Sequence, residues 1–239
     1  MSDEEEQIPT DDGEGEAQNG EAEAHAEVFD EAASWADLGL SEPMLRALAD
    51  MEYTSPTGVQ AQSVPKLLTG RHLLVRSKTG TGKTSAFAIP ILERIEDKAR
   101  ELRAIVLAPT RELALQVAAE TERLAAHRDL SVVSVYGGVG LGPQADALRD
   151  GAEIVVGTPG RVLDHIRRGN MDLSKCKMVC LDEADEMLSM GFLEDVRTVL
   201  ERVPDGMQML LFSATVEADL QNLIKTYAGE PEQIFLSTD

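Results

Sequence analysis

A glycine-rich segment, SKTGTGKTSAF at residues 77–87, has the residue types and spacing that bind phosphate. Gly80 and Gly82 allow a tight backbone curve whose amides can point at one anion, and a helix after them would add its positive end. Lys83 would reach the outer phosphates of a nucleotide, and Thr84 would offer a hydroxyl to Mg²⁺. A plain loop is the alternative, but the spacing favours phosphate binding.

Three carboxylates directly follow an apolar run in KMVCLDEADEML, residues 177–188. Charge at the end of a buried strand is costly unless the site uses it. Asp182 could hold Mg²⁺ through its water ligands, and Glu183 could orient or deprotonate an attacking water, as phosphoryl transfer requires. An acidic helix N-terminus is the simpler alternative, because the helix dipole also favours carboxylates there. The phosphate-loop pattern upstream favours the catalytic interpretation.

Short aliphatic runs predict the strands that position these residues. The runs are mostly continuous Val, Ile and Leu, as in strands buried on both faces, and amphipathic stretches lie between most of them. We therefore expect an α/β fold with a mostly parallel central sheet and helices on both faces. Ligands bind such sheets at the carboxyl ends of the strands, and we expect the Asp182 strand to lie beside the phosphate-loop strand. The predicted strands cover residues 72–77, 104–110, 131–138, 153–159, 177–185, 208–215 and 233–237.

The charge of the chain is unevenly distributed. The 239 residues carry a formal net charge of -21, and residues 1–34 hold thirteen Asp or Glu with no Lys or Arg. This segment is rich in Gly and poor in apolar residues, so we expect a disordered acidic tail followed by one folded domain at 35–239. The tail could bind a protein partner, although a solubilising role is the simpler interpretation.

Composition limits the remaining classes of function. The negative net charge argues against nucleic-acid binding through bulk electrostatics, but not against a local site of backbone amides and a few arginines. Cys176 and Cys180 allow no disulfide framework, and their spacing does not suggest zinc. The sequence shows no signal peptide and no apolar run near about 18 residues, so we expect a cytoplasmic protein without membrane contact.

TGTGKT at 79–84 together with DEAD at 182–185 resembles the DEAD-box family of ATP-dependent RNA helicases. The resemblance extends over about residues 35–237 and implies an amino-terminal RecA-like P-loop domain that binds ATP and Mg²⁺. It implies that Lys83, Asp182 and Glu183 are catalytic, and that Thr84 and Asp182 hold the metal largely through water. The nucleotide-binding set that it implies is Trp35, Tyr53, Thr57, Gln60, Thr79, Gly80, Thr81, Gly82, Lys83 and Thr84.

YTSPTGVQ at 53–60 resembles the adenine-recognition motif of the same family, with Trp35 upstream in the place of its isolated aromatic residue. Gln60 would bond adenine through both ends of its amide, which is the pairing expected of glutamine with adenine. Tyr53 would stack on the ring, and Thr57 would support the phosphate loop.

Further motifs follow in the order of the family. APTREL (108–113), GG (137–138) and TPGR (158–161) resemble its RNA-contacting motifs. Their hydroxyls, glycines and arginines suit RNA phosphates, so the contacts would read the backbone and not the bases. SAT, at 213–215, resembles the motif that couples nucleotide state to strand separation, although each motif alone could be a helix cap or a turn. The RNA-contacting set is Pro109, Thr110, Arg111, Gly137, Gly138, Thr158, Pro159, Gly160 and Arg161, and the coupling set is Asp185, Ser213, Ala214 and Thr215.

The sequence departs from the family at two positions and in one larger respect. Glu52 stands where the family usually has glycine, and Ser77 replaces the usual alanine of the phosphate loop. No segment resembles the second RecA-like domain, whose arginine finger is worth roughly a thousandfold in rate. We therefore expect weak nucleotide binding, poor hydrolysis by the chain alone, and a requirement for a second RecA-like domain.

Two other classes of function stay open at this point. A non-catalytic, nucleotide-dependent binding module would engage RNA or a protein without unwinding, but it would not need Glu183. A DNA helicase or another P-loop ATPase is disfavoured by the adenine-recognition motif and by the run of motifs from PTREL to SAT.

Overall fold

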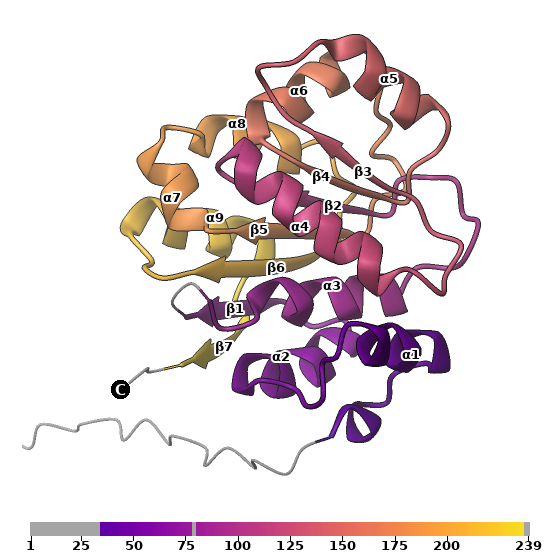
Figure 1. Cartoon of the computed structure of the whole chain (residues 1–239). Coiled ribbons are helices and arrows are strands. Elements are labelled where there is room, and N and C mark those ends of the chain that lie inside the picture. Colours follow the sequence, from indigo (N-terminus) through magenta and orange to yellow (C-terminus); the bar gives the residue numbers. More distant parts are fainter. Residues whose placement is uncertain (1–33, 78–79, 237–239) are drawn as a thin grey trace, which may run out of the picture. The chain divides into compact units, whose positions relative to one another are not determined.

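The computed structural model describes residues 34–77 and 80–236, which form one α/β unit (Figure 1). The predicted tail, apart from Ser34, and Thr79 of the phosphate loop lie outside the described residues. In the part of the chain that is described, no helix is long and apolar enough to cross a membrane.

A seven-stranded sheet occupies the centre of the unit, in the order β3-β4-β2-β5-β6-β1-β7. Every pairing among these strands is parallel. All the predicted strands are present, although most end before the polar residues that follow each apolar run. The strands are β1 (Leu73–Arg76), β2 (Ala104–Leu107), β3 (Val132–Val135), β4 (Ile154–Gly157), β5 (Met178–Asp182), β6 (Gln208–Ser213) and β7 (Glu232–Phe235).

The strand order corrects one expectation. The Asp182 strand β5 does not lie beside the phosphate-loop strand β1, because β6 pairs with both and lies between them. All six residues of β6 are buried, so this strand is suited to an interior position with neighbours on both edges and helices on both faces. The phosphate loop and Asp182 still meet, because all the strands are parallel and their carboxyl ends share one edge of the sheet.

Successive residues of the central strands point to opposite faces and build two cores. Val75, Val106 and Phe212 pack against the helices of one face, and Leu74, Ile105 and Leu211 belong to the core of the other. Phe87 contacts Phe212 edge to face, with ring centroids 5.2 Å apart.

Helices cover both faces of the sheet, as predicted (Figure 1). The first core includes η1 (Trp35–Leu38), α1 (Glu42–Asp50), α2 (Gly58–Leu68), α3 (Lys83–Glu93) and α4 (Arg111–Leu124). The second includes α6 (Pro159–Arg167), α7 (Ala184–Ser189), α8 (Leu193–Leu200) and α9 (Ala218–Ala228). Helix α5 (Leu141–Arg149) follows the edge strand β3 and packs Ala147 and Leu148 against the second core.

Candidate functional site

A cavity of about 670 Å³ opens at the carboxyl edge of the sheet. Its walls come from the segment before α2, the loop between β1 and α3, one side of α4 and the end of β5. Residues predicted from three separate motifs line it together: Tyr53, Thr57, Gln60, Gly80, Thr81, Gly82, Lys83, Thr84, Asp182 and Glu183.

The glycines of the loop adopt the backbone conformation that the phosphate-binding hypothesis requires. Gly80 has φ 81° and Gly82 has φ 87°, both in the left-handed region that favours glycine. Gly82 is the N-cap of α3, so the free amides of the first helical turn open toward the cavity from Lys83 onward. The positive end of an eleven-residue helix is therefore directed at this space.

Asp182 is the most informative group in the cavity. Its side chain is 2% exposed, and its Oδ1 atom has no hydrogen-bond partner among the described residues. Burial raises the pKa of Asp182 to about 6, the Lys83 ammonium opposes this rise, and the Glu183 carboxylate adds to it. A buried carboxylate oxygen without a partner is poorly stabilised unless a cation or its water ligands complete the site.

Glu183 occupies a strained position beside Asp182. It has φ 51° and ψ 53° as the N-cap of α7, a left-handed conformation that costs a non-glycine residue about 1–2 kcal/mol. The conformation places Glu183 on the wall of the cavity, one residue after the end of β5. Such strain is concentrated at functional sites.

The segment before α2 is tied directly to the phosphate loop. Thr57 donates from its hydroxyl to the carbonyl of Thr81 at 3.0 Å. The Gln60 amide donates to the carbonyl of Gly82 at 3.1 Å and accepts from the backbone N–H of Thr57 at 2.8 Å. A Cβ atom added at Gly82 would lie 2.6 Å from Gln60 Nε2, so a larger residue here would displace the Gln60 amide from this contact.

Trp35 lies outside the lining of the cavity, unlike the rest of the described part of its predicted set. It is buried in the first core, and its indole N–H donates to the carbonyl of Tyr53 at 2.8 Å. Trp35 therefore contacts the backbone of a cavity residue and not the cavity itself.

The coupling set forms one hydrogen-bonded cluster between β5 and β6. Asp185 Oδ2 accepts from the backbone N–H of Thr215 at 2.8 Å and from its hydroxyl at 3.0 Å. Ser213 accepts from the backbone N–H of Asp185 at 3.1 Å and donates to the carbonyl of Thr215. Burial opposes ionisation of Asp185, but the hydrogen bonds from Thr215 outweigh it and hold the pKa of Asp185 below its usual value. Ala214 is exposed between these partners.

The same cluster contacts the start of the phosphate loop at Ser77, directly after the carboxyl end of β1. The backbone N–H of Ser77 donates to the carbonyl of Ser213 at 3.3 Å, and the hydroxyls of Ser77 and Thr81 lie 3.3 Å apart. Ser77, which replaces the usual alanine, is thus buried and paired within the loop.

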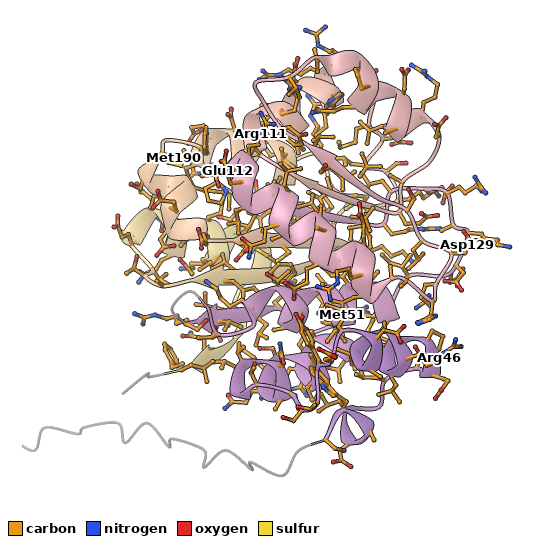
Figure 2. The ribbon with its side chains drawn as sticks, viewed as in Figure 1. Arg46, Met51, Arg111, Glu112, Asp129 and Met190 are labelled. Carbon is orange, nitrogen blue, oxygen red and sulfur yellow. The ribbon has the colours of Figure 1, made fainter. Side chains whose placement is uncertain are left out.

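The predicted RNA-contacting residues gather at the ends of β2, β3 and β4. Thr110 is the N-cap of α4 and accepts from Leu113 N–H at 3.2 Å. Arg111, exposed at the first turn of α4 (Figure 2), stacks over the Tyr136 ring with its guanidinium carbon 4.9 Å from the centroid. Arg161 donates to the carbonyl of Val139 at 3.0 Å.

The other members of that set differ in exposure. Gly137, Gly138 and Gly160 are exposed, and Gly138 has φ 81°. Thr158, the N-cap of α6, is half-buried. Pro109 and Pro159 are buried, so they shape the backbone of their loops and offer little surface to a ligand.

Sequence reasoning missed several residues of the cavity wall, among them a polar group on α3 and α4. Gln116 and Glu120 lie four residues apart on α4, and Ser85 donates its hydroxyl to Glu120. The four-residue spacing on one helix face was the available signal. It could not be used, because nothing in the sequence shows that this face of α4 borders the phosphate loop.

The backbone at Glu52 explains why the family usually has glycine at this position. It has φ 59°, a backbone conformation that glycine adopts without strain, and it also lines the cavity beside Tyr53. Glutamate therefore stands at a position where the backbone itself favours the usual glycine of the family.

The parallel sheet, the phosphate loop and the carboxylates of the β5 end together define a P-loop nucleotide-binding domain. The chain belongs to the DEAD/DEAH box helicase family, whose model matches residues 57–223.

Two comparisons with curated proteins place the chain within this family. It is 48% identical over 202 residues to the ATP-dependent RNA helicase DeaD of Klebsiella pneumoniae, covering 84% of this chain and 31% of that protein. It is 46% identical over 198 residues to the RNA helicase CrhR of Synechocystis sp., covering 83% of this chain and 40% of that protein. The chain therefore spans well under half the length of these relatives.

Solved structures agree with the fold. A DEAD box protein from Methanococcus jannaschii gives a TM-score of 0.79 at 42% identity, covering 84% of this chain and 55% of that one. A hypothetical ATP-dependent RNA helicase from Sulfolobus tokodaii gives a TM-score of 0.76 at 37% identity, covering 82% of this chain and 57% of that one. The fold is thus the RecA-like domain of DEAD-box proteins.

Proposed function

We propose that this domain binds ATP with Mg²⁺ in the cavity and RNA across the ends of β2, β3 and β4, and that it couples ATP hydrolysis to local RNA strand separation. The observation that carries the proposal is the buried Oδ1 of Asp182, which no described residue contacts by a hydrogen bond, in the same cavity as Lys83, Glu183 and the phosphate loop. A domain that merely bound a small anion would need neither carboxylate.

In this proposal each group of the cavity would act on one part of the nucleotide. The amides at the start of α3 and the Lys83 ammonium would hold the phosphates. Asp182 and Thr84 fit a Mg²⁺ ion bound largely through water, which would neutralise charge on the phosphates. Glu183 would orient the attacking water and accept its proton.

Tyr53 and Gln60, which both line the cavity, would bind adenine. The Gln60 amide already contacts Thr57 and Gly82, but an amide has two donor hydrogens and two acceptor lone pairs. The second hydrogen and the second lone pair of the amide can therefore bind adenine while its contacts with Thr57 and Gly82 are kept. Nucleotide identity would therefore be read by a side chain that also contacts the phosphate loop.

RNA would contact the phosphate-binding groups of three strand ends. Arg111 and Arg161 supply charge, and the exposed Gly137, Gly138 and Gly160 allow close approach of the RNA backbone. The cluster of Asp185, Ser213 and Thr215 would transmit the state of the nucleotide, since the carbonyl of Ser213 contacts the base of the phosphate loop. A second RecA-like domain would complete both sites and supply the arginine finger.

A nucleotide titration tests the adenine-reading part of the proposal. Fluorescent ATP and GTP analogues are titrated into the chain with Mg²⁺. We expect ATP to bind at least about tenfold more tightly, because guanine presents the O6 acceptor where adenine presents its N6–H donor to Gln60. Gln60→Leu should remove most of this preference, while Gln116→Leu, on the α4 wall, should keep it. Equal affinities of the unsubstituted chain for ATP and GTP would contradict the assignment.

A further inference from the structure

Gln144 of α5 lies at the centre of a polar cluster that joins the ends of β3 and β4. The cluster, called here the Gln144 cluster, consists of Gln144, Tyr136, Arg161, His165 and Asn170. Gln144 is 8% exposed and His165 is fully buried. Neither residue belongs to a motif of the sequence, and the nucleotide cavity includes neither of them among its lining residues.

The donors and acceptors of the cluster fix its hydrogen positions. Arg161 Nη1 can only donate, so the Gln144 atom 3.1 Å away is the carbonyl oxygen Oε1. His165 Nε2 lies 3.1 Å from the same oxygen and must therefore carry a proton. The remaining ring nitrogen, Nδ1, then accepts from the Asn170 amide at 3.2 Å. His165 thus acts as a neutral donor to Gln144.

The charge environment of His165 agrees with this tautomer. Burial lowers the pKa of His165, and the Arg161 and Arg168 guanidinium groups lower it further against the opposing Asp164 carboxylate. The imidazole is therefore neutral at pH 7, as the acceptor role of Nδ1 toward Asn170 requires.

The cluster holds the glycine pair of residues 137–138 at both ends. On the preceding side, Gln144 Nε2 donates to the carbonyl of Tyr136 at 3.1 Å. On the following side, Arg161 Nη2 donates to the carbonyl of Val139 at 3.0 Å. The Tyr136 ring in turn supports the Arg111 guanidinium. The Gln144 amide therefore connects the segment after β3 to helix α6, and through the Tyr136 residue this connection extends to Arg111 of α4.

We propose that Gln144, held by His165, is a positioning residue that fixes Arg161, the 136–139 segment and Arg111 in one arrangement for binding an RNA backbone. This inference rests on the RNA-binding part of the proposed function. Phosphate contacts depend on several donors being placed at fixed separations, so a preformed arrangement avoids the entropic cost of ordering an exposed loop and two arginines on binding.

Leucine at position 144 keeps the bulk of the side chain and removes its amide. It would leave the Tyr136 carbonyl, the His165 Nε2–H and one Arg161 N–H without their partner. We expect RNA binding by Gln144→Leu to weaken about tenfold, the equivalent of one or two lost hydrogen bonds, with unchanged affinity for ATP.

Gln208→Leu is a matched control. Gln208 is also a buried glutamine, 5% exposed, and its amide donates to the carbonyls of Leu67 and Arg71 at the opposite edge of the sheet. Its loss should lower stability without changing affinity for RNA.

The experiment uses the full 239-residue chain and two probes. Fluorescence anisotropy of a labelled single-stranded oligouridine measures RNA affinity, and a fluorescent ATP analogue measures nucleotide affinity. Hydrogen exchange across residues 136–139, without RNA, reports the order of the loop. Arg161→Ala and the double variant with Gln144→Leu complete a cycle, in which we expect less than additive losses because Gln144 acts partly through Arg161.

The outcomes separate this inference from the function on which it rests. Faster exchange at 136–139 and weaker RNA binding in Gln144→Leu, with Gln208→Leu unchanged in both, support the positioning role. RNA binding by Gln144→Leu at the unsubstituted affinity overturns it, as does an equal loss in both glutamine variants. A chain that binds ATP but no RNA before any substitution overturns the RNA-binding function itself, and the inference with it.

Discussion

The wall of the cavity contains a buried carboxylate and two residues with strained backbone conformations. Asp182 has a buried carboxylate oxygen with no partner in the described part of the chain, and Glu183 and Glu52 both adopt left-handed backbone conformations at the cavity wall. Structures retain such features when the function of the site depends on them. Glu52 differs from Asp182 and Glu183, because the family usually has glycine at this position. Glycine would adopt the same backbone conformation without strain, so the strain at Glu52 comes from the presence of a side chain.

Replacement of Glu52 by glycine should stabilise the domain. The left-handed conformation costs glutamate about 1–2 kcal/mol, and the greater freedom of glycine in the unfolded chain offsets roughly half of this. We expect Glu52→Gly to raise the free energy of unfolding by about 0.5 kcal/mol in urea titrations. Glu52→Ala removes the same carboxylate but keeps the strain. An equal rise in the free energy of unfolding in Glu52→Ala would show that loss of the carboxylate charge, and not relief of backbone strain, stabilises the domain.

Asp185 makes a pH-dependent contribution to stability. Its folded-state pKa is depressed, so the contribution is present above the unfolded pKa of about 4 and is lost as pH falls through the folded value. Asp185→Asn should lower the free energy of unfolding at pH 7 by about 1–2 kcal/mol, because the charged acceptor of Thr215 is lost.

Urea unfolding of Asp185→Asn and of the unsubstituted chain, compared from pH 7 down to about pH 3.5, tests this account. The difference between them should shrink below about pH 4. A difference that stays constant across this range would mean that the ionised carboxylate does not stabilise the cluster.

At the scale of elements, the junction between α2 and α3 decides the shape of the nucleotide cavity. The Gln60 side chain of α2 contacts the N-cap of α3 so closely that a Cβ atom at position 82 would displace it, and the φ of 87° also favours glycine there. The phosphate loop is thereby hydrogen-bonded to Thr57 and Gln60, the segment that we propose reads adenine.

Gly82→Ala should disrupt this junction. The added methyl group meets Gln60 Nε2 at 2.6 Å and the backbone lies at φ 87°, so we expect a loss of at least about 2 kcal/mol in unfolding free energy and of measurable ATP binding. Gly39→Ala is the control, since Gly39 has φ 70° but no atom within 4 Å of the added carbon. Equal losses of stability in the two variants would mean that the contact with Gln60 contributes nothing.

The sequence predicted which segments form strands better than it predicted which strands lie side by side. Apolar runs predicted all seven strands. The signal was strongest for β2, β4, β5 and β6, because strands buried on both faces need apolar residues at nearly every position, whereas the edge strands β3 and β7 are partly exposed. The placement of β6 between β5 and β1 could not be predicted, since strand order depends on which helices pack on which face. The Gln144 cluster was not predictable for the same reason: a glutamine on a short helix acquires its role only when β3 and β4 bring Tyr136 and Arg161 to it.

At the scale of the whole molecule, one edge of the sheet carries every described motif. The phosphate loop follows β1, the RNA-contacting candidates follow β2, β3 and β4, and the catalytic and coupling candidates follow β5 and β6. Parallel strands make this arrangement, because all their carboxyl ends meet at one edge. A partner domain that approached this edge would contact the nucleotide and the RNA together, which is the basis for proposing that hydrolysis needs such a partner.

ATP hydrolysis by the chain, with and without single-stranded RNA and with a second RecA-like domain added in trans, tests the central proposal most directly. We predict very low turnover by the chain alone and RNA-stimulated turnover on mixing, because an arginine finger is worth roughly a thousandfold or more. Glu183→Gln should bind ATP but abolish that turnover. Bound nucleotide without hydrolysis in either mixture would contradict the catalytic assignment and favour a nucleotide-dependent binding module, and strong RNA-stimulated turnover by the chain alone would contradict the need for a second domain.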